Sequence, residues 1–376
     1  MKALASLRVL VVGGGFAGMS AAIELRKFGA EVDLCEIDPG WRNYGAGISL
    51  GGATLRAFRQ LGILEAFLRE GSANDGVELH LSDGTRIATL PTPRLAGADV
   101  PGGGAIMRPV LARILADATR TSGTQVHLGC TLSEVKQDAE GVEVRFADGR
   151  YQRYDLVIAA DGVHSAMRNV MFPHAPRPTY CGQAVWRAVL PRMDEVKTTM
   201  MWLGPVKVGL NPVSAGEMYL FASERRPANE RVDPVTFVDQ LRALLAGFGS
   251  PLLQRVRESI GPQSQIVFRP LEGLLMPRPW YLGRVVLIGD AVHATTPHLA
   301  SGACIGIEDA LVLAEQLGRR ADVPSALQAF EDRRWERCRM VVENSSRLCQ
   351  IEIEDGSMDE HAQIMRDSLM ALAQPI

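Results

Sequence analysis

The 376-residue sequence predicts an α/β fold in which a parallel sheet with helices is interrupted by an antiparallel sheet and followed by a C-terminal helical region. Three patterns predict it. A short apolar run, Val9 to Val12, passes through closely spaced glycines into a helical pattern, Met19 to Phe28, that closes at Gly29. Later segments partly alternate apolar and polar residues between Pro and Gly. The tail from Val323 to Leu348 reads as a helix with one charged face.

The apolar run is typical of a buried parallel strand, and the turn after it has the pattern G-x-G-x-x-G. Its glycines are Gly13, Gly15 and Gly18. The first permits a tight turn, the second lets the backbone approach a pyrophosphate, and the third lets helix and strand pack closely. Phe16 and Ala17 lie within this turn, directly before the predicted helix, whose unpaired N–H groups would receive that anion. A purely structural turn is the alternative.

A second strand, Glu31 to Cys35, follows the helix and ends at Glu36. A carboxylate there, about 20 residues after the turn, would accept hydrogen bonds from a ribose diol. Strand, turn, helix, second strand and terminal acid together favour dinucleotide binding. This unit alone does not separate NAD from FAD.

Two later strands also end at an acidic residue beside a glycine. Leu156 to Ala160 ends in Asp161-Gly162, and another apolar run leads to G-D-A-x-H-x-x-x-P over residues 289–297. With "GAGISL" and "MRPVLARIL", these stretches resemble the single-component FAD-dependent aromatic hydroxylases, the para-hydroxybenzoate hydroxylase family. The resemblance covers nearly the whole chain, and its motifs are specific in their joint order and spacing.

The resemblance implies tight FAD binding at a discontinuous, Rossmann-like FAD-binding domain, residues 1–173 and 270–376. An inserted antiparallel-sheet substrate domain, residues 174–269, lies between. By this match the first acid-glycine pair lies near the pyrophosphate and the passing nicotinamide, and the second acid bonds the ribityl chain. With those of the glycine turn, the expected cofactor-binding residues are Gly13, Gly15, Phe16, Ala17, Gly18, Glu36, Gly47, Arg108, Leu132, Asp161, Gly162, Asp290, Gly302 and Ala303.

The predicted helix from Gly302 to Leu317 would face the flavin ring. Reduced flavin is negative along its N1 and C2 carbonyl edge, and the positive end of a helix dipole stabilises such a charge by about 0.3–2 kcal/mol. An amphipathic packing helix is a compatible alternative. Most members of the family have Asn two residues after this glycine. Here it is Cys304, as in pyridine hydroxylases, which indicates a subfamily.

Three residues are candidates for the substrate and catalysis. His298 follows Pro297 on the expected flavin-facing loop, and its match in the pyridine hydroxylases contacts substrate. A histidine bonded to nearby backbone is the alternative. Arg187 and Tyr219 could bond a phenol or carboxylate from the inserted sheet, or be ordinary sheet residues. The family's 6-hydroxynicotinate enzyme has a His where this chain has Ser49, which puts that substrate in doubt.

No second strand, G-x-G-x-x-G and helix unit follows, so NAD(P)H is expected to bind transiently. The resemblance implies that NAD(P)H reduces FAD and that O2 forms a flavin C4a-hydroperoxide. This hydroxylates an aromatic or N-heteroaromatic, pyridine-like ring. The alternatives are an oxygen-independent FAD oxidoreductase and a non-catalytic flavin-binding sensor.

Composition narrows the partners further. The 40 basic and 43 acidic residues give a net charge of -3 without a dense basic block, so neither nucleic acid nor membrane is expected. No apolar run reaches the roughly 18 residues of a membrane span, and we expect a cytoplasmic monomer or homodimer. The six cysteines are scattered without C-x-x-C, and no His cluster has metal spacing. No metal is therefore expected, and an organic cofactor must carry any redox chemistry.

Overall fold

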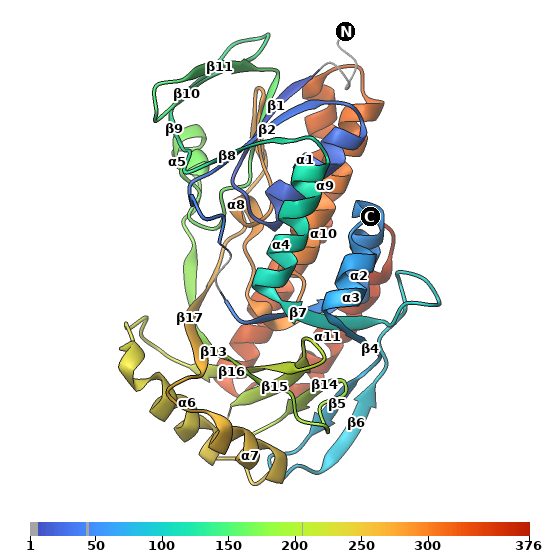
Figure 1. Ribbon diagram of the computed structural model, residues 1–376, viewed down its shortest axis with the longest axis vertical. Helices are drawn as coiled ribbons and strands as arrows, with labels where there is room; N and C mark the ends of the chain where they lie inside the picture. The colour runs from blue at the N-terminus through green and yellow to red at the C-terminus, as the bar shows by residue number, and fades with distance from the viewer. Residues whose placement is uncertain (1–6, 43–44, 205) are drawn as a thin grey trace.

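The computed structural model describes residues 7–42, 45–204 and 206–376. A six-stranded sheet with long helices forms one end of the molecule, and a seven-stranded sheet with two helices forms the other (Figure 1). In spatial order, the six-stranded sheet consists of β18 (Tyr281–Leu282), β19 (Val285–Leu287), β12 (Leu156–Ala159), β1 (Arg8–Val12), β2 (Glu31–Glu36) and β8 (Gln125–Leu128).

The six-stranded sheet is parallel apart from β18. β1 pairs in parallel with β2 and β12, and β12 pairs in parallel with β19. The central residues of β1, Val9 to Val11, are completely buried, as expected for a strand covered on both faces. Because parallel strands present their carboxyl ends at one edge, the turns after β1, β2, β12 and β19 lie along the same edge.

Long helices cover one side of this sheet (Figure 1). They are α1 (Phe16–Lys27), α4 (Arg108–Thr121), α9 (Gly302–Arg319) and α10 (Val323–Glu354). On the other side lie α5 (Ala166–Met171) and a three-stranded sheet of β11 (Tyr151–Tyr154), β10 (Val142–Phe146) and β9 (Leu132–Gln137). Helix α1 begins at Phe16, three residues before the predicted Met19, because Gly15 already has the extended conformation of an N-cap.

The seven-stranded sheet is built mainly from the middle of the chain. In spatial order, it consists of β17 (Gln265–Gly273), β13 (Thr179–Pro191), β16 (Glu217–Arg225), β15 (Lys207–Pro212), β14 (Thr199–Trp202), β5 (Val77–His80) and β6 (Arg86–Leu90). The hairpin β5–β6 comes from the first part of the chain and joins through a parallel pairing of β5 with β14. The seven-stranded sheet therefore includes two strands, β5 and β6, that lie outside the inserted segment 174–269.

The two faces of this sheet have different partners. Trp186, Ala188 and Leu190 of β13 lie in a core closed by α6 (Phe237–Ala246) and α7 (Pro251–Ser259). The alternate residues, Arg187 and Val189, point to the opposite face, because successive strand side chains alternate. That second face is turned toward the FAD-binding segments, since Tyr219 of β16 packs against Gly47.

The remaining elements are shorter or lie outside the two large sheets. They are β3 (Gly47–Gly51), α2 (Gly52–Leu61), α3 (Leu64–Glu70), β4 (Ser72–Asn74), β7 (Gly103–Met107), η2 (Pro234–Thr236), α8 (Asp290–His293), η3 (Pro297–Leu299) and α11 (Met358–Ala373). The order β3-β7-β4 makes a small fourth sheet between them. The tail helix runs six residues past the predicted Leu348, and α11 follows it.

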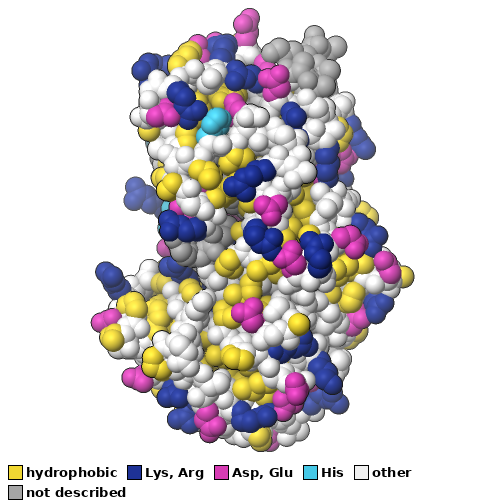
Figure 2. Space-filling model, in the orientation of Figure 1, with side chains coloured by type: hydrophobic (Ala, Val, Ile, Leu, Met, Phe, Trp, Pro, Cys, Tyr) yellow, Lys and Arg dark blue, Asp and Glu magenta, His cyan; other side chains and the backbone are white. Residues whose placement is uncertain are grey.

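The α/β architecture with an antiparallel sheet and a helical C-terminal region is thus confirmed. Basic and acidic side chains are interspersed on the face seen in Figure 2, which has no large region of one sign. Within the described ranges, no helix combines the length and apolar character that a membrane crossing requires.

Candidate FAD and substrate site

The glycine turn after β1 is shaped for close packing at two of its glycines and is open at the third. Gly13 has a φ of +104°, and a Cβ there would overlap the carbonyl oxygen of Ala160. A Cβ on Gly18 would overlap the carbonyl oxygen of Gly13. A Cβ on Gly15 would meet no atom within 4 Å. Gly15 is the N-cap of α1 and offers no side-chain cap, so the first N–H groups of α1 have no side-chain acceptor from the cap residue. This arrangement fits a pyrophosphate.

Glu36 lies next to this turn and binds its backbone. The two carboxylate oxygens accept hydrogen bonds from the N–H groups of Gly14 and Asp38, each at 2.7 Å. A carboxylate has about four acceptor positions, so capacity remains for a ribose diol. The indole of Trp41 donates to the carbonyl oxygen of Gly14 at 2.8 Å, and the guanidinium of Arg120 lies 4.8 Å from the Trp41 ring centre. Glu36 and Trp41 thus hold the turn from two sides.

The Asp161-Gly162 turn lies at the same edge of the sheet. Asp161 accepts hydrogen bonds from the Ser165 hydroxyl at 2.5 Å and from the Met167 N–H at 3.0 Å, and so fixes the start of α5. Gly162 has a φ of +82° and open space where a Cβ would stand. The buried Arg168 donates to the carbonyl oxygen of Ala291 at 2.8 Å. Arg168 therefore ties this turn to the Gly289-Asp290 turn.

The Gly289-Asp290 turn is held to α9 by Asp309. Gly289 has a φ of +61°, and its N–H donates to Asp309 Oδ2 at 2.9 Å. The same oxygen lies 2.6 Å from His293 Nε2, and both side chains are completely buried. Burial opposes a charge on His293, but Cys338 and Asp309 outweigh it and raise the imidazole pKa well above its ordinary value. A charge-assisted hydrogen bond therefore fixes the turn.

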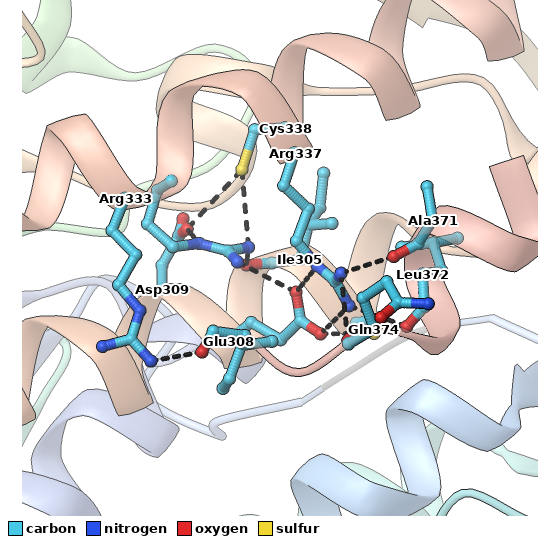
Figure 3. Close-up of polar contacts among 12 residues, drawn as sticks. Ile305, Glu308, Asp309, Arg333, Arg337, Cys338, Ala371, Leu372 and Gln374 are labelled. Atoms are coloured by element: carbon cyan, nitrogen blue, oxygen red, sulfur yellow. Dashed lines mark hydrogen bonds and ion pairs between the residues drawn. The ribbon is translucent and has the colours of Figure 1, made fainter.

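A buried ionic cluster supports this contact from α10 (Figure 3). Arg334 donates to Asp309 Oδ1 at 2.9 Å, to Glu308 Oε2 at 3.0 Å and to the carbonyl oxygen of Ile305 at 3.0 Å. Arg337 pairs with Glu308 at 2.7 Å. Each buried charge has an opposite partner, which is the condition for its being tolerated there. The cluster thus holds the first turns of α9 against α10.

His293, Asp309 and Cys338 have ligand atoms within 4.8 Å of one another, a grouping that could suit a metal ion. The guanidinium of Arg334 contacts both Asp309 and Cys338. A positive charge thus lies on the donor atoms that a cation would need, and the group is better explained as an ionic support for α9.

Five of the predicted site residues come together where the two ends of the molecule meet. Arg108 begins α4, and its guanidinium lies 5.2 Å from the ring centre of Phe16 in the glycine turn. Burial lowers the pKa of Arg108, Arg187 lowers it further, and Asp290 and Tyr219 act in the opposite direction. These interactions place Arg187, Asp290 and Tyr219 around Arg108. Neither arginine has an ion-pair partner among the described residues. Two unpaired guanidiniums favour an anionic ligand.

The Asp290 side chain is accessible to solvent but is also crowded by protein. It is exposed at the start of α8, yet burial is the largest cause that raises the pKa of its carboxyl, while His293 and Arg108 lower it. Both observations hold if solvent reaches the carboxylate from only one side, with protein crowding the others. An accessible acceptor beside the glycine turn fits the polar chain of FAD.

Apolar side chains lie on the same face of the seven-stranded sheet as Arg187. Tyr219 is 5% exposed, and its ring centre lies 5.8 Å from that of Phe221. Phe221 stands opposite Arg187 in the β13–β16 pairing, and a Cβ on Gly209 would overlap the Phe221 ring, so this glycine makes room for it. One apolar cluster joins the two parts of the molecule: Ala46, Ala105 and Met107 come from the FAD-binding segments, and Val189, Val213, Tyr219 and Phe221 come from the seven-stranded sheet and its β15–β16 turn. The rings of Tyr219 and Phe221 thus lie at the junction of the two parts.

His298 lies on η3, but its imidazole is 1% exposed. Nδ1 lies 2.9 Å from the Thr296 hydroxyl, and Nε2 lies 3.1 Å from Gln183 Oε1 and 3.3 Å from Glu352 Oε2. Burial lowers its pKa, and Lys207 adds to that effect. Nδ1 thus has a partner in its own loop, and Nε2 has partners in β13 and α10.

The other predicted residues occupy supporting positions. Gly47 is buried, and a Cβ there would overlap the ring of Tyr219. Leu132 begins β9 and packs against the main core. Gly302 and Ala303 open α9 and are half-buried. Cys304 is 1% exposed, and its thiol lies 3.7 Å from Glu308 Oε1, so it packs inside the helix layer.

Sequence reasoning gave no site role to Trp41, Asp309, Arg334 or Phe221 and did not recognise that Arg168 joins two turns. The i, i+3 spacing of Ser165 and Arg168 beyond "DG" signalled a capped helix. In the sequence, Arg334 is one of many charged residues on the predicted charged face of the tail helix. Only its burial against Glu308 and Asp309 distinguishes it.

Comparisons with known proteins agree with this geometry. The sequence model of a family described as FAD binding domain matches residues 6–345. Aurachin C monooxygenase/isomerase of Stigmatella aurantiaca is 32% identical, covering 92% of this chain and 89% of its own. FAD-dependent urate hydroxylase of Klebsiella pneumoniae is 31% identical, covering 92% and 90%. The crystal structure of Klebsiella pneumoniae HpxO complexed with FAD and uric acid superposes with a TM-score of 0.80 at 27% identity, covering 98% of this chain and 93% of that one. The resemblance to FAD-dependent hydroxylases is thereby confirmed.

Proposed function

The chain belongs to the FAD binding domain family and is an FAD-dependent monooxygenase, and on this premise we propose that it hydroxylates an aromatic or N-heteroaromatic ring that carries an anionic group. The observation that carries the proposal is the Arg108 and Arg187 pair beside Tyr219, without ion-pair partners among the described residues. Relatives named for urate and aurachin C support a heteroaromatic ring.

In this proposal FAD, when bound, supplies electron transfer from NAD(P)H to O2 and oxygen transfer to the ring. The chain holds the cofactor at three places. The N–H groups at Gly15 and the start of α1 bind the pyrophosphate, Glu36 binds the ribose, and Asp290 binds the ribityl chain. The N-terminus of α9 stabilises negative charge on the reduced ring.

The substrate lies on the apolar face of β13 and β16. Arg187 binds its carboxylate or ring oxygen through charge-assisted hydrogen bonds, and the Tyr219 hydroxyl is the candidate partner for a phenol. Tyr219, Phe221 and Val189 exclude water from the reacting ring. These hydrogen bonds favour the deprotonated form of the ring hydroxyl. The resulting oxygen anion raises the electron density at the ring carbon to be hydroxylated.

His298 acts in this proposal as a positioning residue. Its imidazole is buried against Gln183 and Glu352, so it fixes the loop between α8 and α9 to β13. It thereby sets the distance between the flavin-facing loop and the strand that carries Arg187.

NAD(P)H binds transiently, because no second dinucleotide unit occurs in the sequence. We propose residues 1–173 and 270–376 as the FAD-binding domain and 174–269 as the substrate domain, with β5 and β6 attached to the latter in space. A monomer or homodimer in the cytoplasm remains our expectation.

The test is a ligand panel with the purified yellow protein. NADH and NADPH oxidation and O2 uptake are measured with hydroxylated benzoates, hydroxypyridine carboxylates, quinolones, and uncharged analogues of each. We expect anionic rings to stimulate both rates equally and to yield a product 16 mass units heavier, the mass of one oxygen atom. Oxygen-independent turnover would favour a reductase, and stimulation only by uncharged rings would overturn the assignment of Arg187.

A further inference from the structure

Two cysteines far apart in the sequence have their sulfur atoms together. Cys181 lies on β13 and Cys349 on α10, 168 positions later, and their Sγ atoms are 3.1 Å apart. This is about 1 Å longer than a disulfide bond. All six cysteines are free thiols, and Cys35, Cys130, Cys304 and Cys338 are buried. In the described contacts, Cys181 and Cys349 are the one pair of thiols within hydrogen-bonding distance.

The two thiols have different surroundings. Cys181 is half-buried, whereas Cys349 is 1% exposed. The hydrogen bond from the Cys349 thiol lowers the pKa of Cys181 more than burial raises it, and the N–H of Gln183 also lowers it. The same hydrogen bond and burial raise the pKa of Cys349. The accessible sulfur is therefore the one that more readily becomes a thiolate, the nucleophilic form.

We propose that Cys181 and Cys349 form a redox site that hydrogen peroxide converts reversibly into a disulfide between the substrate sheet and the C-terminal helix. The Cys181 thiolate attacks the peroxide, so that an S–O bond forms, the O–O bond breaks and hydroxide leaves. Cys349 then attacks the sulfenic sulfur, and water leaves. In sum, two thiols lose two electrons and two protons, and one peroxide becomes two water molecules.

The site is connected to the flavin-facing loop. The Cys349 sulfur lies 3.6 Å from Gln183 Oε1, and that oxygen lies 3.1 Å from His298 Nε2. Disulfide formation removes the thiol proton that Cys349 can donate to Gln183. It also links β13 directly to α10, closing a loop of 168 residues. Oxidation should therefore stabilise the fold, because long closed loops restrict the unfolded chain most.

The experiment treats the FAD-loaded protein with hydrogen peroxide, then denatures and alkylates it and maps its peptides by mass spectrometry. We expect loss of two of the six alkylated thiols, one linked peptide containing Cys181 and Cys349, a higher Tm, and recovery of all thiols with dithiothreitol. The readout is thiol chemistry, so it does not depend on which substrate the enzyme takes.

Three serine variants separate the roles. Cys349→Ser should block the linked peptide and let a sulfenic acid at Cys181 be trapped by dimedone, whereas Cys181→Ser should block both products. Cys130→Ser, at another buried cysteine, should leave the linkage intact. Three results would overturn the proposal: retention of all six thiols in the peroxide-treated parent protein, overoxidation of Cys181 without linkage, or a disulfide between Cys349 and another cysteine in Cys181→Ser.

Discussion

His293 Nε2 lies 2.6 Å from Asp309 Oδ2, and neither side chain is accessible to solvent. Asp309 also receives the N–H of Gly289 and the guanidinium of Arg334. One carboxylate thus joins the turn that presents Asp290 to the helix that begins at Gly302. The expected ribityl contact and the expected ring contact cannot move independently.

Asp309→Asn should destabilise the fold by about 3–5 kcal/mol, because it leaves Arg334 with a buried charge that has lost one of its partners. Urea denaturation measures the change. Glu315→Gln removes an α9 carboxylate that pairs with exposed arginines and serves as the control, with an expected loss of no more than about 1 kcal/mol. Equal effects of the two variants would show that the buried cluster has no special role.

Gly15→Ala should fold with unchanged stability when FAD is absent, since its Cβ meets no atom within 4 Å. It should bind FAD at least 10-fold more weakly, because the methyl group enters the space assigned to the pyrophosphate. Fluorescence titration of the apoprotein gives the Kd. Gly216→Ala, at an exposed hairpin position with the same open space, should leave the Kd unchanged. An unaltered Kd for FAD in Gly15→Ala would contradict the assignment of the pyrophosphate to this turn.

Arg187→Gln should raise the KM for an anionic ring about 10- to 100-fold, the range expected for losing hydrogen bonds to a charged group worth about 1.5–3 kcal/mol. The KM for an uncharged analogue should change far less. Steady-state kinetics with both substrates tests this difference. An equal fold-increase in KM for the anionic ring and the uncharged analogue would mean that Arg187 supports the sheet and does not bind the anionic group.

His298→Gln should make stability less dependent on pH below about 6.5, the ordinary pKa of histidine. Burial and Lys207 lower the His298 pKa in the folded protein, so the folded state binds this proton less readily than the unfolded state. The stabilisation is present above the unfolded pKa and is lost as the pH falls through the folded pKa. Urea midpoints from pH 8 to pH 5 should fall more steeply for the unmodified protein than for the variant.

His361 also lies 3.3 Å from Glu352, on the same carboxylate as His298, so His361→Gln is the matched control. Parallel pH profiles for the unmodified protein and His298→Gln would refute the assignment. A flatter pH profile in His361→Gln alone would assign the pH dependence of stability to His361.

Several features could be predicted from the sequence because they depend on short stretches. The turn at Gly13, Gly15 and Gly18 follows from the steric demands of three glycines and the apolar run before them. The Asp233 N-cap and Pro234 likewise predict a helical start, which the structure places at η2 before α6. The family resemblance then supplied the order in which distant motifs meet.

Other features depend on how distant segments pack. The β5–β6 hairpin joins the inserted sheet because an open strand edge of β14 is available to pair with it. Arg334 is buried because α10 crosses α9 at two carboxylates. His298 turned from an expected substrate contact into a candidate positioning residue because Gln183 and Glu352 surround its ring.

The sequence by itself determined the glycine turn and the strands that end in acids, since local sterics and residue spacing govern these, and its resemblance to a known family indicated FAD. Tertiary structure alone decided which charges are paired, that Arg108 and Arg187 share one region, and that two scattered cysteines meet. Burial and proximity set the energies of these groups, and neither quantity is fixed until the whole chain has closed on itself.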